Sequence, residues 1–173
     1  MKFRELDTNS ADDVHELLKI RNDEGVRRNL IHNSKISLEQ HLFWVDSVYI
    51  GNDSIKIWLI EDIVGVDIIG YIDFKLNYQL KMVEIGYKIK SEFQGQGKGK
   101  AAVIWSLKHV KKVYKAYKPY LTVLENNDIA IALYKKYGFR INEKLKSQMF
   151  PVGSDYKNRY YKLLYMSLGV DDG

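Results

Sequence analysis

The stretch Gln94-Gly95-Gln96-Gly97-Lys98-Gly99 places three alternating glycines between two segments of different hydrophobic period. Before it, Met82 to Ile89 alternates as a strand does, and from Lys100 apolar residues recur every three or four positions, which predicts a helix ending before Pro119. Glycines at such a junction can turn successive N–H groups toward one point, where the helix N-terminus adds partial positive charge. A flexible turn is the alternative, but the junction favours a phosphate site.

Upstream of this stretch, the sequence predicts a strand, two helices and two further strands. The expected elements are a strand at Lys2 to Leu6, a helix from the caps Asp7 to Ser10 through about Ile20, a helix opened by the capping box Ser37 to Gln40 with Leu38, Leu42, Val45 and Val48 at helical spacing, and strands at Ser54 to Ile60 and Ile63 to Leu76. Together with Met82 to Ile89, the last two strands are expected to pair antiparallel.

Downstream, the pattern predicts a short strand, a capped helix and two closing strands. These are Tyr120 to Leu124, Asp128 to Tyr137 capped by Asn127 and ended by Gly138, Phe139 to Lys146, and Arg159 to Leu168. The order β-α-α-β-β-β-α-β-α-β-β predicts an α/β (α+β) fold with a mixed, mostly antiparallel sheet of six to seven strands flanked by about four helices. The 173 residues lack a linker-like tract and fit one domain, 1–173.

The composition excludes several classes of protein. No cysteine is present, so disulfides, thiolate catalysis and cysteine-ligated zinc are excluded, as suits a reducing cytoplasm. Met1 to Ser10 lacks the apolar core of a signal peptide, and no window approaches the roughly 18 apolar residues of a membrane span, so we expect a cytoplasmic protein without a membrane partner. The four histidines show no metal-ligand spacing, and we expect no metal.

The net charge of +5 is compatible with a nucleic acid, an anionic surface or a polyphosphate ligand. Much of the excess lies in one window that begins at the glycine stretch, with lysines at positions 98, 100, 108, 111, 112, 115 and 118. A basic nucleic-acid-binding domain is an alternative suggested also by the thirteen tyrosines. No recognition-module signature accompanies them, so we expect no nucleic-acid partner.

Two motifs resemble the GNAT acetyltransferases. Gln94, Gly97 and Gly99 match the signature Q/R-x-x-G-x-G/A, and Leu121 to Phe139 looks like the segment V-x-x-x-N-x-x-A-x-x-L-Y-x-K-x-G-F. The resemblance covers residues 82–140 and implies the GNAT fold. It also implies an enzyme that moves an acetyl group from acetyl-CoA, its cosubstrate, to a primary amine by direct transfer in a ternary complex. An inactive CoA-binding module is the alternative.

The resemblance further implies which residues hold the coenzyme. The expected contacts are backbone N–H groups at Tyr87, Lys88 and Ile89, a pyrophosphate loop formed by Gln94, Gly95, Gln96, Gly97, Lys98, Gly99 and Lys100, and the side chain of Asn127. Lys98 departs from the apolar or aromatic residue that the family often has there. Asn127 would cap its helix in any protein, and we expect both roles.

Acetyl transfer to an amine needs a base and an acid. An alkylammonium, with a reference pKa near 10.4, must lose a proton before it attacks a thioester. Glu84 interrupts the apolar alternation of its strand and is the candidate base, acting through a water, with a structural ion pair as the alternative. Tyr134 matches the family's general acid, with core filling as the alternative.

The acceptor is expected from the N-terminal helices. Arg21 to Arg27 and Ile36 to Leu42 look similar to acetyltransferases of UDP-linked 4-amino sugars in pseudaminic acid biosynthesis, so Arg21, Arg27 and His41, with Arg28, are candidates for binding a nucleotide-sugar diphosphate. A protein N-terminal amine, as in ribosomal-protein acetyltransferases, and a polyamine are the alternatives, and a polyamine site would need acidic side chains. The expected partner is this small-molecule amine acceptor, and a homodimer is left open.

Overall fold

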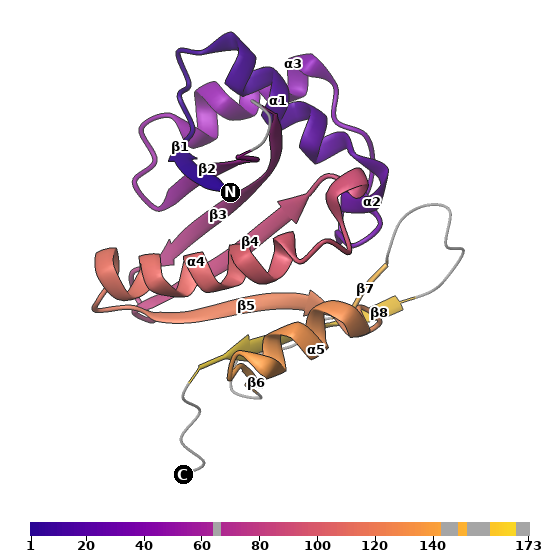
Figure 1. Ribbon diagram of the computed structural model, residues 1–173. Coiled ribbons are helices and arrows are strands. Elements are labelled where there is room, and N and C mark those ends of the chain that lie inside the picture. The colour runs from indigo at the N-terminus through magenta and orange to yellow at the C-terminus, as the bar shows by residue number, and fades with distance from the viewer. Residues whose placement is uncertain (64–66, 143–148, 152–159, 169–173) are drawn as a thin grey trace.

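The computed structural model describes residues 1–63, 67–142, 149–151 and 160–168 (Figure 1). Its helices are α1 (Ala11–Asn22), α2 (Glu24–Arg27), α3 (Leu38–Trp44), the π-helical η1 (Val45–Tyr49), the 3₁₀ turn η2 (Ser91–Phe93), α4 (Lys98–Val113) and α5 (Asp128–Lys136). Its strands are β1 (Lys2–Glu5), β2 (Ile55–Glu61), β3 (Ile68–Asn77), β4 (Met82–Ile89), β5 (Lys118–Leu124), β6 (Arg140–Ile141), β7 (Met149–Pro151) and β8 (Tyr160–Ser167).

Seven of these strands form one path in the order β1-β2-β3-β4-β5-β8-β6, and β7 pairs with β8. Every pairing is antiparallel except that of β4 with β5, which is parallel. The expected fold class, a mixed and mostly antiparallel sheet of six to seven strands with helices on its faces, is confirmed. Among the described residues, each helix is too short or too polar to cross a membrane.

Helices cover both faces of the sheet because neighbouring residues of its central strands point to opposite sides. Leu59 and Tyr71 belong to the core under α1, whereas Ile60 and Ile72 belong to the core under α4. The helix α5 lies on the same side as α4, since the cluster of Tyr134 includes Val103 of α4. Figure 1 shows α4 lying across β3 and β4.

The local signals at helix starts are confirmed. Ser10 accepts a hydrogen bond from Asp13 N at 3.3 Å, and Ser37 and Gln40 form the expected capping box. The buried face of α3 and η1 differs from the spacing noted in the sequence, however. His41, Val45 and Tyr49 are buried, whereas the side chains of Leu38, Leu42 and Val48 are exposed. Tertiary packing therefore buries a different face of this helical segment from the one that the sequence pattern indicated.

Several boundaries also differ from expectation. The helix expected from Lys100 begins at Lys98, and the strand expected from Ile63 begins at Ile68, just after Asp67, whose carbonyl accepts a hydrogen bond from Asp62 N. The short helix α2 forms within a stretch that the sequence presented only as polar. Of the closing strands, β6 covers Arg140–Ile141, while residues 143–146 and 159 lie outside the described residues.

The pairing of β4 with β5 positions the rest of the molecule. It comprises only three register pairs, Met82 with Lys118, Val83 with Pro119, and Glu84 with Tyr120. Within the described part of the chain, the remainder of β4, from Ile85 to Ile89, pairs with β3 alone. The N–H and C=O groups of successive strand residues point to opposite edges of the strand. Some of those between Ile85 and Ile89 therefore point toward the edge of β4 that β5 does not pair with.

The closest approach of β3 to β4 gives a test of this packing. A Cβ on Gly70 would lie 2.2 Å from the carbonyl oxygen of Lys88, which is backbone and cannot rotate away. Gly70→Ala should therefore lower the free energy of unfolding by about 1–3 kcal/mol, as overpacking does, measured by urea denaturation. The exposed substitution Ile63→Ala should change it by less than about 0.5 kcal/mol. Equal stability of the two variants would contradict this register.

Candidate active site

The glycine stretch forms an open loop between η2 and α4. Gly95 and Gly97 have φ angles of 74° and 75°, in the left-handed region, and a Cβ built on either meets nothing within 4 Å. Space is therefore left above this loop, at the positions where the sequence predicted backbone N–H groups. The positive φ angles explain why glycine stands at both positions.

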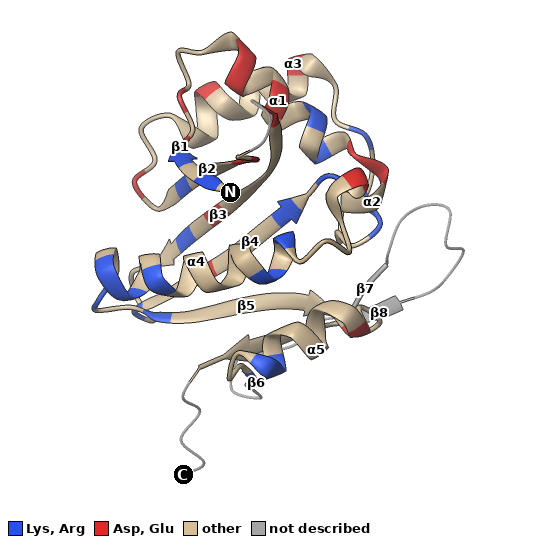
Figure 2. Ribbon diagram, viewed as in Figure 1, with Lys and Arg blue, Asp and Glu red and all other residues tan. Residues whose placement is uncertain are grey.

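The N-terminus of α4 lacks the usual side-chain cap. Gly97 is the N-cap residue, no side chain of the described residues caps it, and the first turn contains no acidic residue. The first free N–H groups of this 16-residue helix therefore retain their partial positive charge. Lysines continue along α4 (Figure 2). Lys98 itself forms an ion pair with Asp62 at 3.1 Å, which explains the lysine at a position where the family often has an apolar residue.

Hydrogen bonds on either side of η2 fix the position of the glycine loop. Gln94 donates a hydrogen bond from Nε2 to the carbonyl of Ile89 at 2.8 Å, so its side chain returns to the end of β4. Asp23 accepts hydrogen bonds from both the N–H and the hydroxyl of Ser91, at 3.2 and 2.7 Å. These contacts tie the loop to the last strand residue and to the start of α2.

Tyr87 connects the loop to the candidate acid. A Cβ on Gly99 would lie 3.2 Å from the ring of Tyr87, so this third glycine serves close packing. The rings of Tyr87 and Tyr134 meet edge to face with centroids 6.2 Å apart, and Phe139 covers Tyr134 from another side. The side chain of Tyr87 is a contribution that the sequence did not indicate, since only its backbone was expected to act.

Tyr134 is protonated at neutral pH. Burial raises its pKa well above the ordinary value of 10, and the neighbouring hydroxyl of Tyr87 raises it further. Aromatic and aliphatic side chains surround Tyr134, and its hydroxyl interacts with that of Tyr87. Asn127 accepts a hydrogen bond from Ala130 N at 3.2 Å, which confirms its capping role and places it at the start of the helix that carries Tyr134.

Glu84 lies on the opposite face of β4 from Tyr87, because the two residues are three positions apart and successive side chains of a strand alternate between its faces. Its Oε1 accepts a hydrogen bond from the Thr122 hydroxyl at 2.8 Å, and its Oε2 lies 3.7 Å from Lys75 Nζ. Thr122 thus holds one oxygen of the Glu84 carboxylate, and the other faces the half-exposed ammonium of Lys75. Glu84 and Tyr134 therefore lie on different faces of the sheet, near the point where the pairing of β4 with β5 ends.

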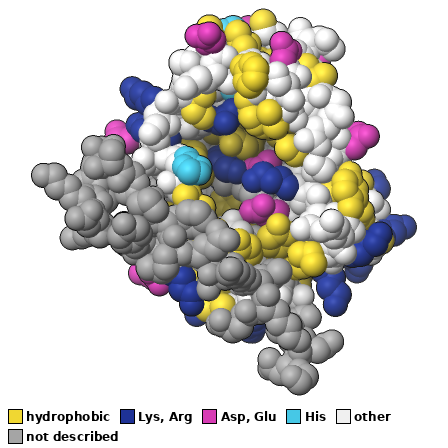
Figure 3. Space-filling model, turned by 180° about the vertical axis from the view of Figure 1, so that it is seen from behind, with side chains coloured by type: hydrophobic (Ala, Val, Ile, Leu, Met, Phe, Trp, Pro, Cys, Tyr) yellow, Lys and Arg dark blue, Asp and Glu magenta, His cyan; other side chains and the backbone are white. Residues whose placement is uncertain are grey.

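Further charged residues share the face of Glu84, and the sequence analysis did not single them out as a group. The cross-strand register places Asp73 opposite Gly86 and Lys75 opposite Glu84, while Lys88 pairs with Asp73. Burial alone would raise the pKa of Asp73, but Lys88 and Lys75 outweigh it and hold that pKa below its ordinary value. Figure 3 shows basic and acidic side chains gathered in a hollow of this face.

Arg21 and His41 form one buried unit. His41 is fully buried, with Nε2 2.9 Å from the carbonyl of Val14 and Nδ1 3.0 Å from Arg21 Nη1. Because a carbonyl only accepts, Nε2 carries the proton and Nδ1 accepts from the guanidinium. Arg21 also lies 4.6 Å from the centroid of the Trp44 ring. His41 therefore has no surface to offer an acceptor, contrary to expectation, and instead positions Arg21.

The other two arginines are occupied by the protein itself. Arg27 donates to the carbonyls of Asn22 and Asn33, at 3.1 and 2.6 Å, and so fixes the chain after α2. Arg28 forms an ion pair with Glu24 on the surface. Arg21, Arg27 and Arg28, the candidates for binding a diphosphate, thus each have a partner within the protein.

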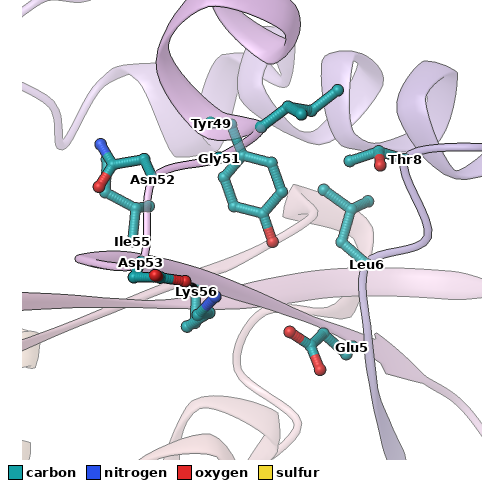
Figure 4. A pocket seen from close by; sticks show the side chains of 10 residues that line it. Glu5, Leu6, Thr8, Tyr49, Gly51, Asn52, Asp53, Ile55 and Lys56 are labelled. Carbon is teal, nitrogen blue, oxygen red and sulfur yellow. Dashed lines mark hydrogen bonds and ion pairs between the residues drawn. The ribbon is translucent and has the colours of Figure 1, made fainter.

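A separate depression of about 230 Å³ lies between the end of β1 and the turn that precedes β2 (Figure 4). Leu6, Tyr49 and Gly51 are among its lining residues, and neither Glu84 nor the glycine loop contributes to it. Within the described ranges, His, Asp and Glu residues form no group of three that could hold a metal ion.

A glycine loop at a strand-to-helix junction, beside an opening in the sheet, is typical of α/β proteins that hold a phosphate-bearing ligand. The model of the Acetyltransferase (GNAT) family matches residues 15–139 of this chain. The chain belongs to the GNAT acetyltransferase family.

Relatives within this family include polyamine acetyltransferases. A spermine/spermidine N(1)-acetyltransferase of Bacillus subtilis (strain 168) is 39% identical over 57 residues, 33% of this chain and 38% of that protein. A spermidine N(1)-acetyltransferase of Escherichia coli (strain K12) is 30% identical over 84 residues, 49% of this chain and 45% of that protein. The matched stretches thus span less than half of either relative.

The fold is also similar to solved structures. The crystal structure of a spermidine N-acetyltransferase from Vibrio cholerae in complex with CoA and spermine gives a TM-score of 0.81 at 19% identity, covering 96% of this chain and 94% of that one. At this identity the likeness shows the fold alone. The named relatives act on polyamines, and none supports the expected link to UDP-amino-sugar acetyltransferases.

The burial of His41 predicts a pH dependence of stability. Burial lowers the pKa of His41, so as pH falls below about 6.5 the unfolded chain binds a proton that the folded chain does not. Stability is therefore full above this range and lost on acidification, by up to about 1.4 kcal/mol per pH unit for this group.

We expect His41→Gln to reduce the loss of stability between pH 7 and pH 5, because glutamine can donate to Val14 and accept from Arg21 without titrating. Denaturant unfolding at several pH values measures this slope. His109, whose pKa burial also lowers, contributes equally to both proteins. The exposed control His32→Gln should keep the wild-type slope. A wild-type slope in His41→Gln would show that His41 does not titrate as described.

Proposed function

We propose that this protein is an N-acetyltransferase that moves the acetyl group of acetyl-CoA to a primary amine of a polyamine such as spermidine. The observation that carries the proposal is the position of Glu84 and Tyr134 on opposite faces of the sheet, where the pairing of β4 with β5 ends and near an uncapped helix N-terminus. Family membership and the names of the relatives support the same reading.

The coenzyme fits the residues present. The open space above Gly95 and Gly97 and the free N–H groups of Lys98, Gly99 and Lys100 suit a pyrophosphate, which needs backbone donors and room for close approach. Gln94 and Gln96 act at this loop mainly by bracing it, through hydrogen bonds to Ile89 O and Glu92 O. The unpaired edge of β4 offers backbone groups of Tyr87 and Ile89 to the remaining chain of the coenzyme, whereas the carbonyl of Lys88, also expected to contribute, faces Gly70 of β3.

Acetyl-CoA supplies the activated acetyl thioester, and the side chains of Glu84 and Tyr134 transfer the protons. Glu84 accepts a proton from the acceptor ammonium, directly or through a water, and frees the amine lone pair to attack the thioester carbonyl. Backbone N–H groups of β4 stabilise the oxygen on which negative charge develops. Tyr134 then gives its proton to the departing sulfur, and the nitrogen gives up its second proton, which restores the Tyr134 hydroxyl and leaves a neutral amide and free CoA thiol.

The proton transfer from Tyr134 needs a physical account. At reference values a phenol of pKa near 10 would protonate a thiolate of conjugate pKa near 8.5 only at a cost of ~2 kcal/mol. Burial raises the pKa of Tyr134 further. The leaving sulfur lies in the same buried space in this proposal, so burial disfavours the thiolate too and raises the pKa of its thiol. The difference between the pKa of Tyr134 and that of the CoA thiol therefore stays small.

A cationic acceptor suits the face that carries Glu84. The sequence argued against a polyamine because of three arginines, yet His41, Trp44, Glu24 and two backbone carbonyls engage all of them. Glu84 supplies an acidic side chain of the kind that a polyamine needs, while Asp73 on the same face is paired with Lys88. A protein N-terminal amine remains the alternative acceptor.

Release of free thiol from acetyl-CoA tests the function. Spermidine and spermine should each support thiol release far above the rate of coenzyme hydrolysis alone, and mass spectrometry should find the acetylated amine. Release with a peptide N-terminus but with neither polyamine would transfer the proposal to protein acceptors. Release with no primary amine of the panel would contradict acetyl transfer altogether.

Coenzyme binding is tested at the loop. Gly97→Ala places a methyl group in the open space and strains a positive φ, so we expect acetyl-CoA affinity to fall at least about tenfold by calorimetry. Gly51 is the matched control, because it has a φ of 76° and equally open surroundings away from the loop. Gly51→Ala should bind acetyl-CoA as the wild type does. If both variants bound equally well, the pyrophosphate would have to lie elsewhere.

Tyr134→Phe separates chemistry from binding. The variant loses only a hydroxyl, so acetyl-CoA affinity should persist while kcat falls by roughly 10²- to 10⁴-fold, the range for loss of a general acid. Tyr114→Phe removes a hydroxyl from the core at the end of α4 and should leave kcat unchanged. A kcat for Tyr134→Phe within about twofold of the wild type would assign Tyr134 to core packing alone.

A further inference from the structure

Lys75 holds its ammonium between two carboxylates on the acceptor face. Its Nζ lies 3.6 Å from Asp73 Oδ2 and 3.7 Å from Glu84 Oε2, distances longer than a normal charged hydrogen bond. The Lys75 side chain is 51% exposed, whereas those of Asp73 and Glu84 are 7% and 19% exposed. A loosely held, half-exposed cation thus covers two largely buried anions.

Lys88 lies on the same face and is held more firmly than Lys75. Its Nζ donates to Asp73 Oδ1, lies 5.0 Å from the centroid of the Tyr71 ring, and its side chain is 16% exposed. Gly86 makes room for this pair, because a Cβ there would lie 2.5 Å from Asp73 Oδ1 and 2.8 Å from Lys88 Nζ. Asp73 is therefore neutralised without Lys75, and Lys75 can leave without stranding a buried charge.

Glu84 has one oxygen available for chemistry, and Lys75 faces it. Thr122 holds Oε1 by a hydrogen bond, so a proton from an acceptor must reach Oε2. A primary alkylammonium on the acceptor has the same chemistry as the lysine side chain that lies there. The two ammonium groups would compete for one place, since like charges in contact repel.

We propose that Lys75 is a specificity-determining residue that occupies the acceptor's ammonium position beside Glu84 and is displaced when a cationic acceptor binds. The proposal rests on the proposed function. Displacement preserves the charge balance, because one ammonium leaves as another enters, and a neutral acceptor could not make this exchange. The lysine swings into solvent at small cost, as exposed ion pairs contribute little.

Lys75→Met tests the proposal, because methionine keeps most of the length and removes the charge. We expect the KM for spermidine to fall about two- to fivefold, the worth of one exposed ion pair, with kcat and the KM for acetyl-CoA near wild-type values. The difference should shrink at high salt, which screens the competition. Lys75→Arg keeps the cation and should not lower the KM for spermidine.

Lys56→Met is the matched control, since it removes one positive charge from β2 on the opposite face, where Lys56 pairs in register with Phe74. It should leave the KM for spermidine unchanged. Thermal unfolding confirms that each variant is folded, and Lys75→Gln replaces Lys75→Met if the latter is not. An unchanged or raised KM in an active, folded Lys75→Met would overturn the displacement proposal alone. A wild type inactive on every amine would overturn the proposed function, and this proposal with it.

Discussion

The parallel pairing of β4 with β5 ends at Glu84 and Tyr120, and the β4 backbone beyond that point has a partner on one side only. A continuous sheet would bury these polar groups in a ladder and leave no passage between its faces. The side chain of Tyr87 lies on the part of β4 that β5 does not pair with, and it packs against both the core under α4 and that of α5.

The two faces of the opening differ in chemistry because the cores on either side differ. Toward α4 and α5 the surroundings are aromatic and aliphatic, which raises the pKa of Tyr134 and keeps it protonated. Toward α1 the same strands carry acidic and basic side chains at alternating positions. The burial of Asp73 and Lys88 is tolerated because the two form an ion pair. A proton acceptor and a proton donor can coexist within one site because the sheet separates their environments.

Local signals made the central motifs predictable from the sequence. Met82 to Ile89 alternates and forms β4 with those bounds, Ser37 and Gln40 form their capping box, and the glycine stretch precedes a helix. Each of these depends on residues within one turn or one strand. The resemblance to the GNAT family added the roles of Glu84 and Tyr134, which remain proposals.

Features that depend on distant residues escaped the sequence analysis. Arginine at three nearby positions suggested an anion site, yet the partners that occupy Arg21 and Arg27 come from α3 and from the carbonyl of Asn33. Likewise, Lys75 meets Glu84 only through the register of β3 with β4, although the polar residues at alternate positions of both strands hinted at a charged face. The arginines were assigned to an acceptor site for this reason, since residue type and spacing reveal a charge but not its partner.

The account depends most on where the coenzyme lies, and a crystal structure of the protein with CoA would test this most directly. The account predicts pyrophosphate oxygens within hydrogen-bond distance of the backbone N–H groups from Gly97 to Lys100. It also predicts the CoA sulfur between β4 and β5, within reach of the Tyr134 hydroxyl. A coenzyme bound with its sulfur on the outer side of α4, or with its pyrophosphate away from this loop, would contradict it.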